Sequence, residues 1–149
     1  MNRARLAPRA ILILCAAMLV LAAACDNRSR DRSEAGKVLF ALERVRAAPN
    51  EGKRRPAEEL SHATCSSPLV CGARDSCAEV YRHLAIGTET ALRVKDELDK
   101  LEKEPAADPG KVGRLAGELD RADTEINDAR DGMHRCEEAA TLLRRTFGI

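Results

Sequence analysis

The sequence has very few aromatic residues and no excess of charge of either sign. Its 149 residues include one tyrosine, two phenylalanines and no tryptophan, and the formal net charge is +1. Ligand pockets and base-stacking surfaces are commonly lined by aromatic rings, so neither kind of site is indicated. A nearly neutral chain also has no electrostatic reason to bind nucleic acid, and we expect no nucleic-acid partner.

Recognised catalytic motifs are missing as well. The sequence has no Gly-rich phosphate loop, no nucleophile elbow and no His-Glu-x-x-His. Its many acids, among them Asp96, Glu97 and Glu118, alternate with basic residues in the way that is typical of solvated helical faces. Because a catalytic carboxylate pair requires burial or a cleft, we expect neither an enzyme nor a cofactor.

Two related heptad patterns occupy most of the chain and predict an all-α fold. Small or apolar residues recur at alternating spacings of three and four from Val70 to Leu101 and again from Val112 to Phe147. Between the two patterns, residues 104–110 include two prolines and a glycine, which indicates a reversal of the chain. The patterns therefore predict a long antiparallel helical hairpin, similar to a coiled coil, over residues 67–149.

The register of this hairpin follows from a constant sum of facing residue numbers. Folding at the reversal places Cys77 opposite Cys136 and Ile126 opposite Gly87, so that large residues face small ones. The helix ends carry their own signals: Ser67 before Pro68 and Asp108 before Pro109 predict N-caps, and Gly148 predicts a C-cap. Serine or aspartate caps, proline in the first turn and glycine after the last turn are the usual arrangement.

Residues 34–66 predict a short N-terminal helical segment packed near the base of the hairpin. Asp31 and Glu34 form a possible capping box before an apolar stripe that runs through Leu42. Turn residues at 49–52 end this helix, and Pro56 is expected to begin a second, short one.

The sequence has six cysteines, of which Cys15 and Cys25 lie in the N-terminal segment. The other four, Cys65, Cys71, Cys77 and Cys136, predict two disulfides if the chain is exported. Cys71 and Cys77 lie six residues apart on one predicted helix, about 9 Å along its axis, which is too far for a bridge. We therefore expect Cys65 to pair with Cys71 and Cys77 to pair with Cys136. A zinc site that includes His62 is the alternative, but the spacing lacks paired Cys-x2-4-Cys elements, and no metal is expected.

Apolar residues outside the heptad seam line one flank of the first predicted arm. They are Tyr81, Ala85 and Leu92. Two interpretations remain open: the N-terminal helix covers this flank as a third helix, or the flank is exposed and binds a protein partner.

The N-terminus has the organisation of a bacterial export signal. Arg3, Arg5 and Arg9 precede a short apolar run that ends in small residues, directly before Cys25. The residues Leu21, Ala22, Ala23, Ala24 and Cys25 resemble the lipobox of bacterial lipoproteins. That resemblance implies a signal peptide over residues 1–24, a lipid on Cys25 and attachment to a bacterial membrane, facing the periplasm or the cell surface. The alternative is a secreted protein cleaved near Ala24.

After the signal, residues 25–33 are polar and predict a flexible tether. Together these features predict a non-enzymatic envelope lipoprotein that acts as a scaffold or adaptor and presents its hairpin to a protein partner. The alternative is a small-molecule or metal-binding module at the hairpin base, near His62 and Cys65.

Overall fold

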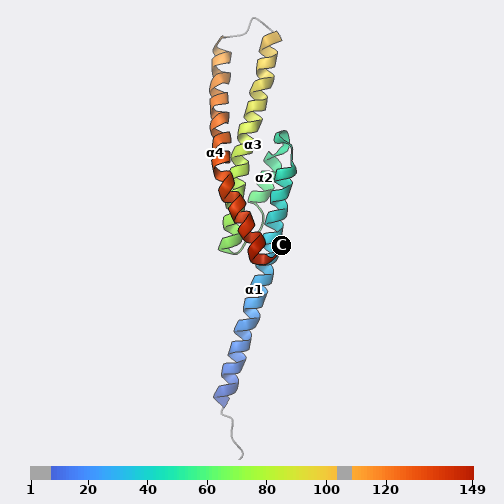
Figure 1. Ribbon diagram of the computed structural model, residues 1–149, viewed down its shortest axis with the longest axis vertical. Coiled ribbons are helices and arrows are strands. Elements are labelled where there is room, and N and C mark those ends of the chain that lie inside the picture. Colours follow the sequence, from blue (N-terminus) through green and yellow to red (C-terminus); the bar gives the residue numbers. More distant parts are fainter. Residues whose placement is uncertain (1–7, 104–108) are drawn as a thin grey trace, which may run out of the picture.

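The computed structural model describes the backbone of residues 8–103 and 109–149, and the side chains of residues 27–103 and 110–149. Its elements are α1 (Pro8–Ala47), the 3-10 turn η1 (Asn50–Gly52), α2 (Arg54–Ser61), α3 (Pro68–Lys103) and α4 (Pro109–Phe147). No described residue lies in a strand, so the all-α prediction is confirmed. Helices α3 and α4 form a long hairpin, and α1 and α2 pack beside its lower half (Figure 1).

The ends of the hairpin helices are explained by the local sequence. At the start of α3, the Ser67 hydroxyl accepts a hydrogen bond from the backbone N–H of Val70 at 3.4 Å. At the end of α4, Gly148 adopts a φ of 65°, and its N–H donates to the Arg144 carbonyl at 2.9 Å. This is the left-handed C-cap that glycine favours. The N-cap predicted at Asp108 lies outside the described residues.

The register predicted for the hairpin is confirmed. A disulfide joins Cys77 to Cys136, and a Cβ atom on Gly87 would lie 2.7 Å from Cγ1 of Ile126. The seam becomes more exposed toward the tip, because two helices alone cannot enclose it. There Leu98 is 37% exposed and Val112 is 49% exposed.

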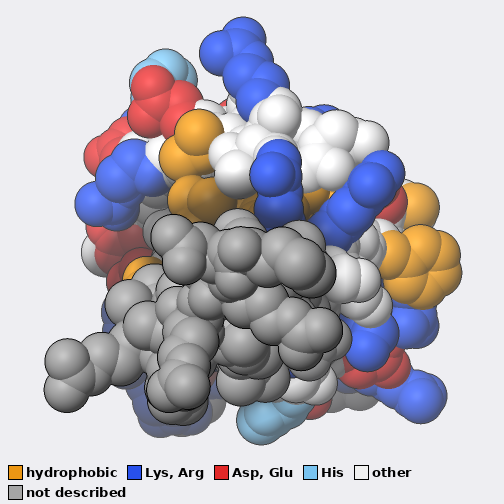
Figure 2. Space-filling model, turned by 90° about the horizontal axis from the view of Figure 1, so that it is seen from below, with side chains coloured by type: hydrophobic (Ala, Val, Ile, Leu, Met, Phe, Trp, Pro, Cys, Tyr) orange, Lys and Arg blue, Asp and Glu red, His pale blue; other side chains and the backbone are white. Residues whose placement is uncertain are grey.

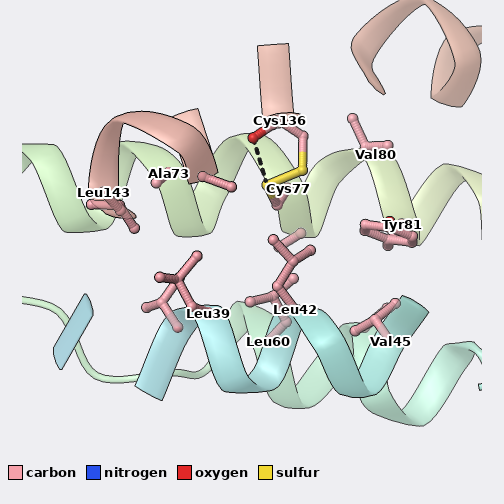
Figure 3. Close-up of a cluster of buried hydrophobic side chains, with 14 of the residues drawn as sticks. Leu39, Leu42, Val45, Leu60, Ala73, Cys77, Val80, Tyr81, Cys136 and Leu143 are labelled. Atoms are coloured by element: carbon pink, nitrogen blue, oxygen red, sulfur yellow. Dashed lines mark hydrogen bonds between the residues drawn. A yellow bond between two sulfur atoms is a disulfide. The ribbon is translucent and has the colours of Figure 1, made fainter. Parts of the chain in front are cut away.

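The core of the protein lies at the base of the hairpin, where α1 and α2 close over α3 and α4. Figure 3 shows apolar side chains of α1 and α2 pointing toward the hairpin residues above them. The side chains from α1 and α2 are Leu39, Leu42, Val45 and Leu60, and those from the hairpin are Ala73, Cys77, Val80, Tyr81, Cys136 and Leu143. Burial of this cluster orders the N-terminal helices against the hairpin.

A buried lysine ends α1 and fixes the turn to α2. The Lys53 side chain is only 8% exposed, and its Nζ donates to the carbonyl oxygens of Ala48 at 2.7 Å, Val45 at 3.1 Å and Arg46 at 3.4 Å. A cation at a helix C-terminus satisfies carbonyls that have no intrahelical partner and opposes the helix dipole. Helix α2 then begins at Arg54, two residues before the start expected at Pro56.

The other disulfide and a buried carboxylate hold the chain that leads into α3. Cys65 is bonded to Cys71, as the spacing predicts. Glu34 is 6% exposed, and its Oε2 accepts hydrogen bonds from the backbone N–H and the hydroxyl of Ser66, at 2.6 and 2.8 Å. The capping box predicted for Asp31 and Glu34 is therefore wrong: Glu34 lies well inside a continuous α1 and binds a different segment.

Residues 25–33 also differ from the expected flexible tether, because they are helical and belong to α1. No proline or glycine occurs between Pro8 and Gly36, so nothing in the backbone chemistry interrupts this helix. The described part of the segment enters the base of the domain as a stalk rather than as an extended linker.

Candidate functional site

Most of the flank predicted to bind a partner is covered. Tyr81 is 5% exposed and Ala85 is 2% exposed, while Leu92 is half-buried. Tyr81 faces α1 as part of the core cluster (Figure 3). The prediction that this flank is exposed is therefore wrong. The N-terminal helices cover it, in agreement with the competing interpretation. The apolar stripe of α1 needs burial, and the Tyr81 side of α3 provides it.

A hollow lies immediately beside this covered flank, between α2 and α3. It is a half-open groove of about 520 Å³. Its lining has an apolar part and a charged rim. The apolar part is Ala57, Ala78, Ala85 and Ile86; the polar part is Arg54, Glu58, Ser61, Asp75, Glu79 and Arg82. We call this the α2–α3 groove.

The groove exists because short side chains meet where the two helices pack. Ala57 on α2 is 4% exposed, and Ala78 and Ala85 on α3 are 6% and 2% exposed. A methyl group satisfies the contact between helices but does not fill the space beside it. A bulky aliphatic side chain from another molecule fits such a space.

The charges on the rim divide into paired and unpaired groups. Arg54 forms an ion pair with Glu89 at 3.0 Å, and Asp75 pairs with Arg74 at 2.7 Å. Among the residues whose side chains are described, Glu58, Glu79 and Arg82 on this rim form no ion pair. The three unpaired side chains on the rim therefore carry a net charge of −1.

A second group of charges closes α1 onto α4. Glu43 accepts from Arg144 at 2.8 Å and from Arg46 at 2.6 Å, and Arg46 also donates to Glu137 at 2.5 Å. Burial acts to lower the pKa of Arg46, but hydrogen bonds with Tyr81 and Glu137 and the nearby carboxylates raise that pKa overall. These charges are satisfied within the fold and leave little for a ligand.

The histidines and cysteines do not assemble a metal site in the described part of the chain. No group of three or more His, Cys, Asp or Glu side chains comes together there. Cys65 is committed to its disulfide, His62 is exposed, and His83 pairs with Glu125 through Nδ1 at 2.6 Å. The metal alternative at the hairpin base therefore has no ligand set among these residues.

The membrane-anchoring features lie at the edge of what the structure describes. Cys25 is in α1, but its side chain, like those of the predicted signal peptide, is outside the described residues. Within the described residues, no helix combines the length and apolar character needed to span a bilayer. Lipidation of Cys25 stays a prediction from the sequence.

Comparison of the chain with protein-family models, with curated proteins and with solved structures gives no match.

Sequence reasoning found Ala85 but missed the other residues of the α2–α3 groove. Their positions on α2 and α3 could be predicted, but the side of α3 on which α2 packs could not. The one available signal was alanine at both Ala78 and Ala85, seven residues apart and therefore on the same face of α3.

Proposed function

We propose that this protein is a non-enzymatic envelope lipoprotein, anchored through Cys25, that acts as an adaptor and binds a helical segment of a protein partner in the α2–α3 groove. The observation that carries the proposal is the groove itself: a floor of buried alanines beside a rim of unpaired charges. Exposed apolar hollows with polar rims are typical of sites that receive a partner's side chains.

The shape of the groove favours an amphipathic helix as its occupant. Helix α2 has only eight residues, about 12 Å in length, so one side of the groove accommodates about two turns of a partner helix. Small side chains such as Ala57 and Ala78 allow a close approach between helices. Aliphatic anchors at positions i and i+4 of the partner would enter the floor.

The charge of the rim favours basic residues beside the aliphatic anchors of the partner helix. Among the residues whose side chains are described, no cation pairs with Glu58 on α2 or Glu79 on α3, and Arg82 supplies a single opposing charge on the rim. A partner with lysine or arginine beside its aliphatic anchors complements this pattern. Such charges contribute more to orientation and association rate than to affinity.

The arrangement of the helices suits presentation away from a membrane. Helix α1 enters at one end of the protein, and the hairpin tip lies at the other end (Figure 1). If Cys25 carries the anchor, the groove is held above the bilayer by the described part of α1, from residue 27 onward.

Charge reversal on the rim tests the proposal. Glu58→Lys combined with Glu79→Lys should abolish the protein adduct that mild crosslinking of the native envelope gives with the wild type. Both carboxylates are exposed and form no ion pair with the described part of the chain, so thermal unfolding should not change by more than a few tenths of a kcal/mol. Asp120→Lys with Asp123→Lys, which are exposed on the distal part of α4, makes the same change in net charge and serves as the control. Equal loss of the adduct in both variants would remove the groove from the proposal.

The alternative function, a small-molecule binding module, uses the same groove. Its volume of about 520 Å³ lies within the range of known ligand sites. One assay distinguishes the two functions. The small-molecule module is supported if a small ligand is extracted with the wild-type protein but not with Ser61→Trp, which fills the groove. A crosslinked protein and no such ligand supports the adaptor.

A further inference from the structure

The stalk of the domain carries a concentration of positive charge that the fold does not use. Helix α1 has four basic residues between 28 and 37, namely Arg28, Arg30, Arg32 and Lys37, and all four are exposed. Arg32 donates a hydrogen bond from Nη2 to the Gly148 carbonyl at 3.4 Å. Within the described residues, Arg28 and Arg30 have no partner.

The three arginines surround the helix instead of forming one face. With 3.6 residues per turn, Arg28 and Arg32 lie on the same side and Arg30 lies on the opposite side. The residues between them, Ser29 and Asp31, are also polar, so this segment has no apolar stripe with which to lie flat in an interface. We call Arg28, Arg30 and Arg32 the arginine girdle.

Arginines outnumber acids around the girdle. Residues 26–33 hold the three arginines and two acids, Asp26 and Asp31, for a net charge of +1. Glu34, which follows, is buried and accepts two hydrogen bonds from Ser66, so it is not free to pair with the arginines. Figure 2, which views the protein from this end, shows Lys and Arg side chains at the top and the right of the view, with Asp and Glu side chains beside them at the upper left and lower right.

The height of the girdle along α1 matches the headgroup layer of a bilayer. At 1.5 Å per residue, Arg28 and Arg32 lie about 5 and 11 Å beyond Cys25. The polar layer on each side of the hydrocarbon core is about 5–8 Å thick. A lipid on Cys25 therefore places the arginines level with, or just above, the phosphates.

We infer that the arginine girdle binds the headgroups of anionic phospholipids on all sides of the stalk and so holds α1 upright on the bilayer. This inference rests on the anchoring part of the proposed function and is independent of the groove. Guanidinium groups bind phosphate oxygens through two parallel hydrogen bonds, and basic clusters next to a membrane anchor attract anionic lipid.

Lipid counting tests the inference on the complete protein. The full chain, extracted from membranes, is reconstituted into nanodiscs of equal phosphatidylglycerol and phosphatidylcholine, and the lipids that stay bound are counted by native mass spectrometry. The ratio of retained phosphatidylglycerol to retained phosphatidylcholine should exceed the bulk ratio by about fivefold in the wild type. Arg28→Gln, Arg30→Gln and Arg32→Gln together should reduce the ratio to the bulk value.

The matched control removes the same charge far from the stalk. Lys95→Gln, Lys103→Gln and Arg121→Gln are exposed changes on the distal hairpin, and they should leave the enrichment intact. The double change Arg28→Gln and Arg30→Gln preserves the contact of Arg32 with Gly148, so a loss of enrichment in this variant cannot come from a loosened base.

Fatty-acid labelling of Cys25 in the same samples separates the two proposals. A labelled chain without enrichment, or with equal enrichment in the girdle and distal variants, overturns the girdle and leaves the adaptor standing. A chain that neither labels nor enters the nanodisc overturns the anchor, and the girdle with it.

Discussion

The close approach of the hairpin helices at Gly87 makes a quantitative prediction about stability. A Cβ atom at this position would lie 2.7 Å from Cγ1 of Ile126 and 2.8 Å from the backbone carbonyl oxygen of Ala122. The carbonyl belongs to the opposing helix and cannot rotate away, so α3 and α4 must separate locally. Overpacking of this kind costs about 1–3 kcal/mol. Against this, alanine gains about 1 kcal/mol of helix propensity over glycine.

Gly117 provides the matched control for Gly87. It is also inside a hairpin helix, but a Cβ atom there would have nothing within 4 Å. Gly87→Ala and Gly117→Ala share the same propensity gain, so the difference between their unfolding free energies isolates the steric cost. We expect Gly117→Ala to be the more stable variant by about 1–3 kcal/mol.

Thermal unfolding followed by circular dichroism measures this difference. A change of 1 kcal/mol shifts Tm by about 2–4 °C in a domain of this size. Gly117→Ala should unfold above the wild type, and Gly87→Ala at or below it. Equal stabilisation by both substitutions would refute the close packing of α3 on α4 at this layer, and with it the predicted register.

Three further predictions follow from single contacts. Replacing Cys77 and Cys136 by alanine opens a loop of 59 residues, which the chain-entropy estimate values at about 4 kcal/mol of stability. Urea unfolding measures this loss, and an unchanged unfolding free energy would contradict the bridge. Lys53→Met removes the ammonium that binds three carbonyls at the end of α1 and should lower the free energy of unfolding by about 1–3 kcal/mol. An unchanged midpoint of urea unfolding would contradict the buried contact. Hydrogen bonds and charges from Lys111 and Lys100 lower the pKa of Glu97 to about 2. Any stabilisation from this partly exposed carboxylate is present above its unfolded pKa of 4.5 and is lost as the pH falls toward 2. An NMR titration midpoint near 4.5 would contradict the pairing.

The hairpin could be predicted from the sequence because its information is local and redundant. Ten seam positions on one arm and eleven on the other define the same register, and the Cys77–Cys136 bridge falls in one of its layers. The end of α4 could be predicted equally well, since only glycine readily adopts the left-handed conformation found at Gly148. Features of this kind depend on periodicity and backbone chemistry, which are visible without the tertiary structure.

The position of the N-terminal helices could not be predicted, because several apolar surfaces of the hairpin could have received them. Tyr81 and Ala85 are compatible with either an exposed flank or a buried one, and only the packing of α1 and α2 decides between these. The role of Glu34 depends in the same way on Ser66, which is distant in sequence. The α2–α3 groove follows from that packing and was missed for that reason.

Site-specific photo-crosslinking in the native envelope tests the central claim that the α2–α3 groove binds a protein partner. Arg82 lies on the rim of the groove, is exposed and forms no ion pair within the described residues, so a benzoylphenylalanine in its place should not disturb the fold. Ala116, exposed on the distal part of α4, provides the control position. If the groove binds a partner, position 82 should give a single protein adduct that disappears with Glu58→Lys and Glu79→Lys, and position 116 should give none. An adduct of equal yield from both positions, or one that survives the rim substitutions, would contradict partner binding in the groove.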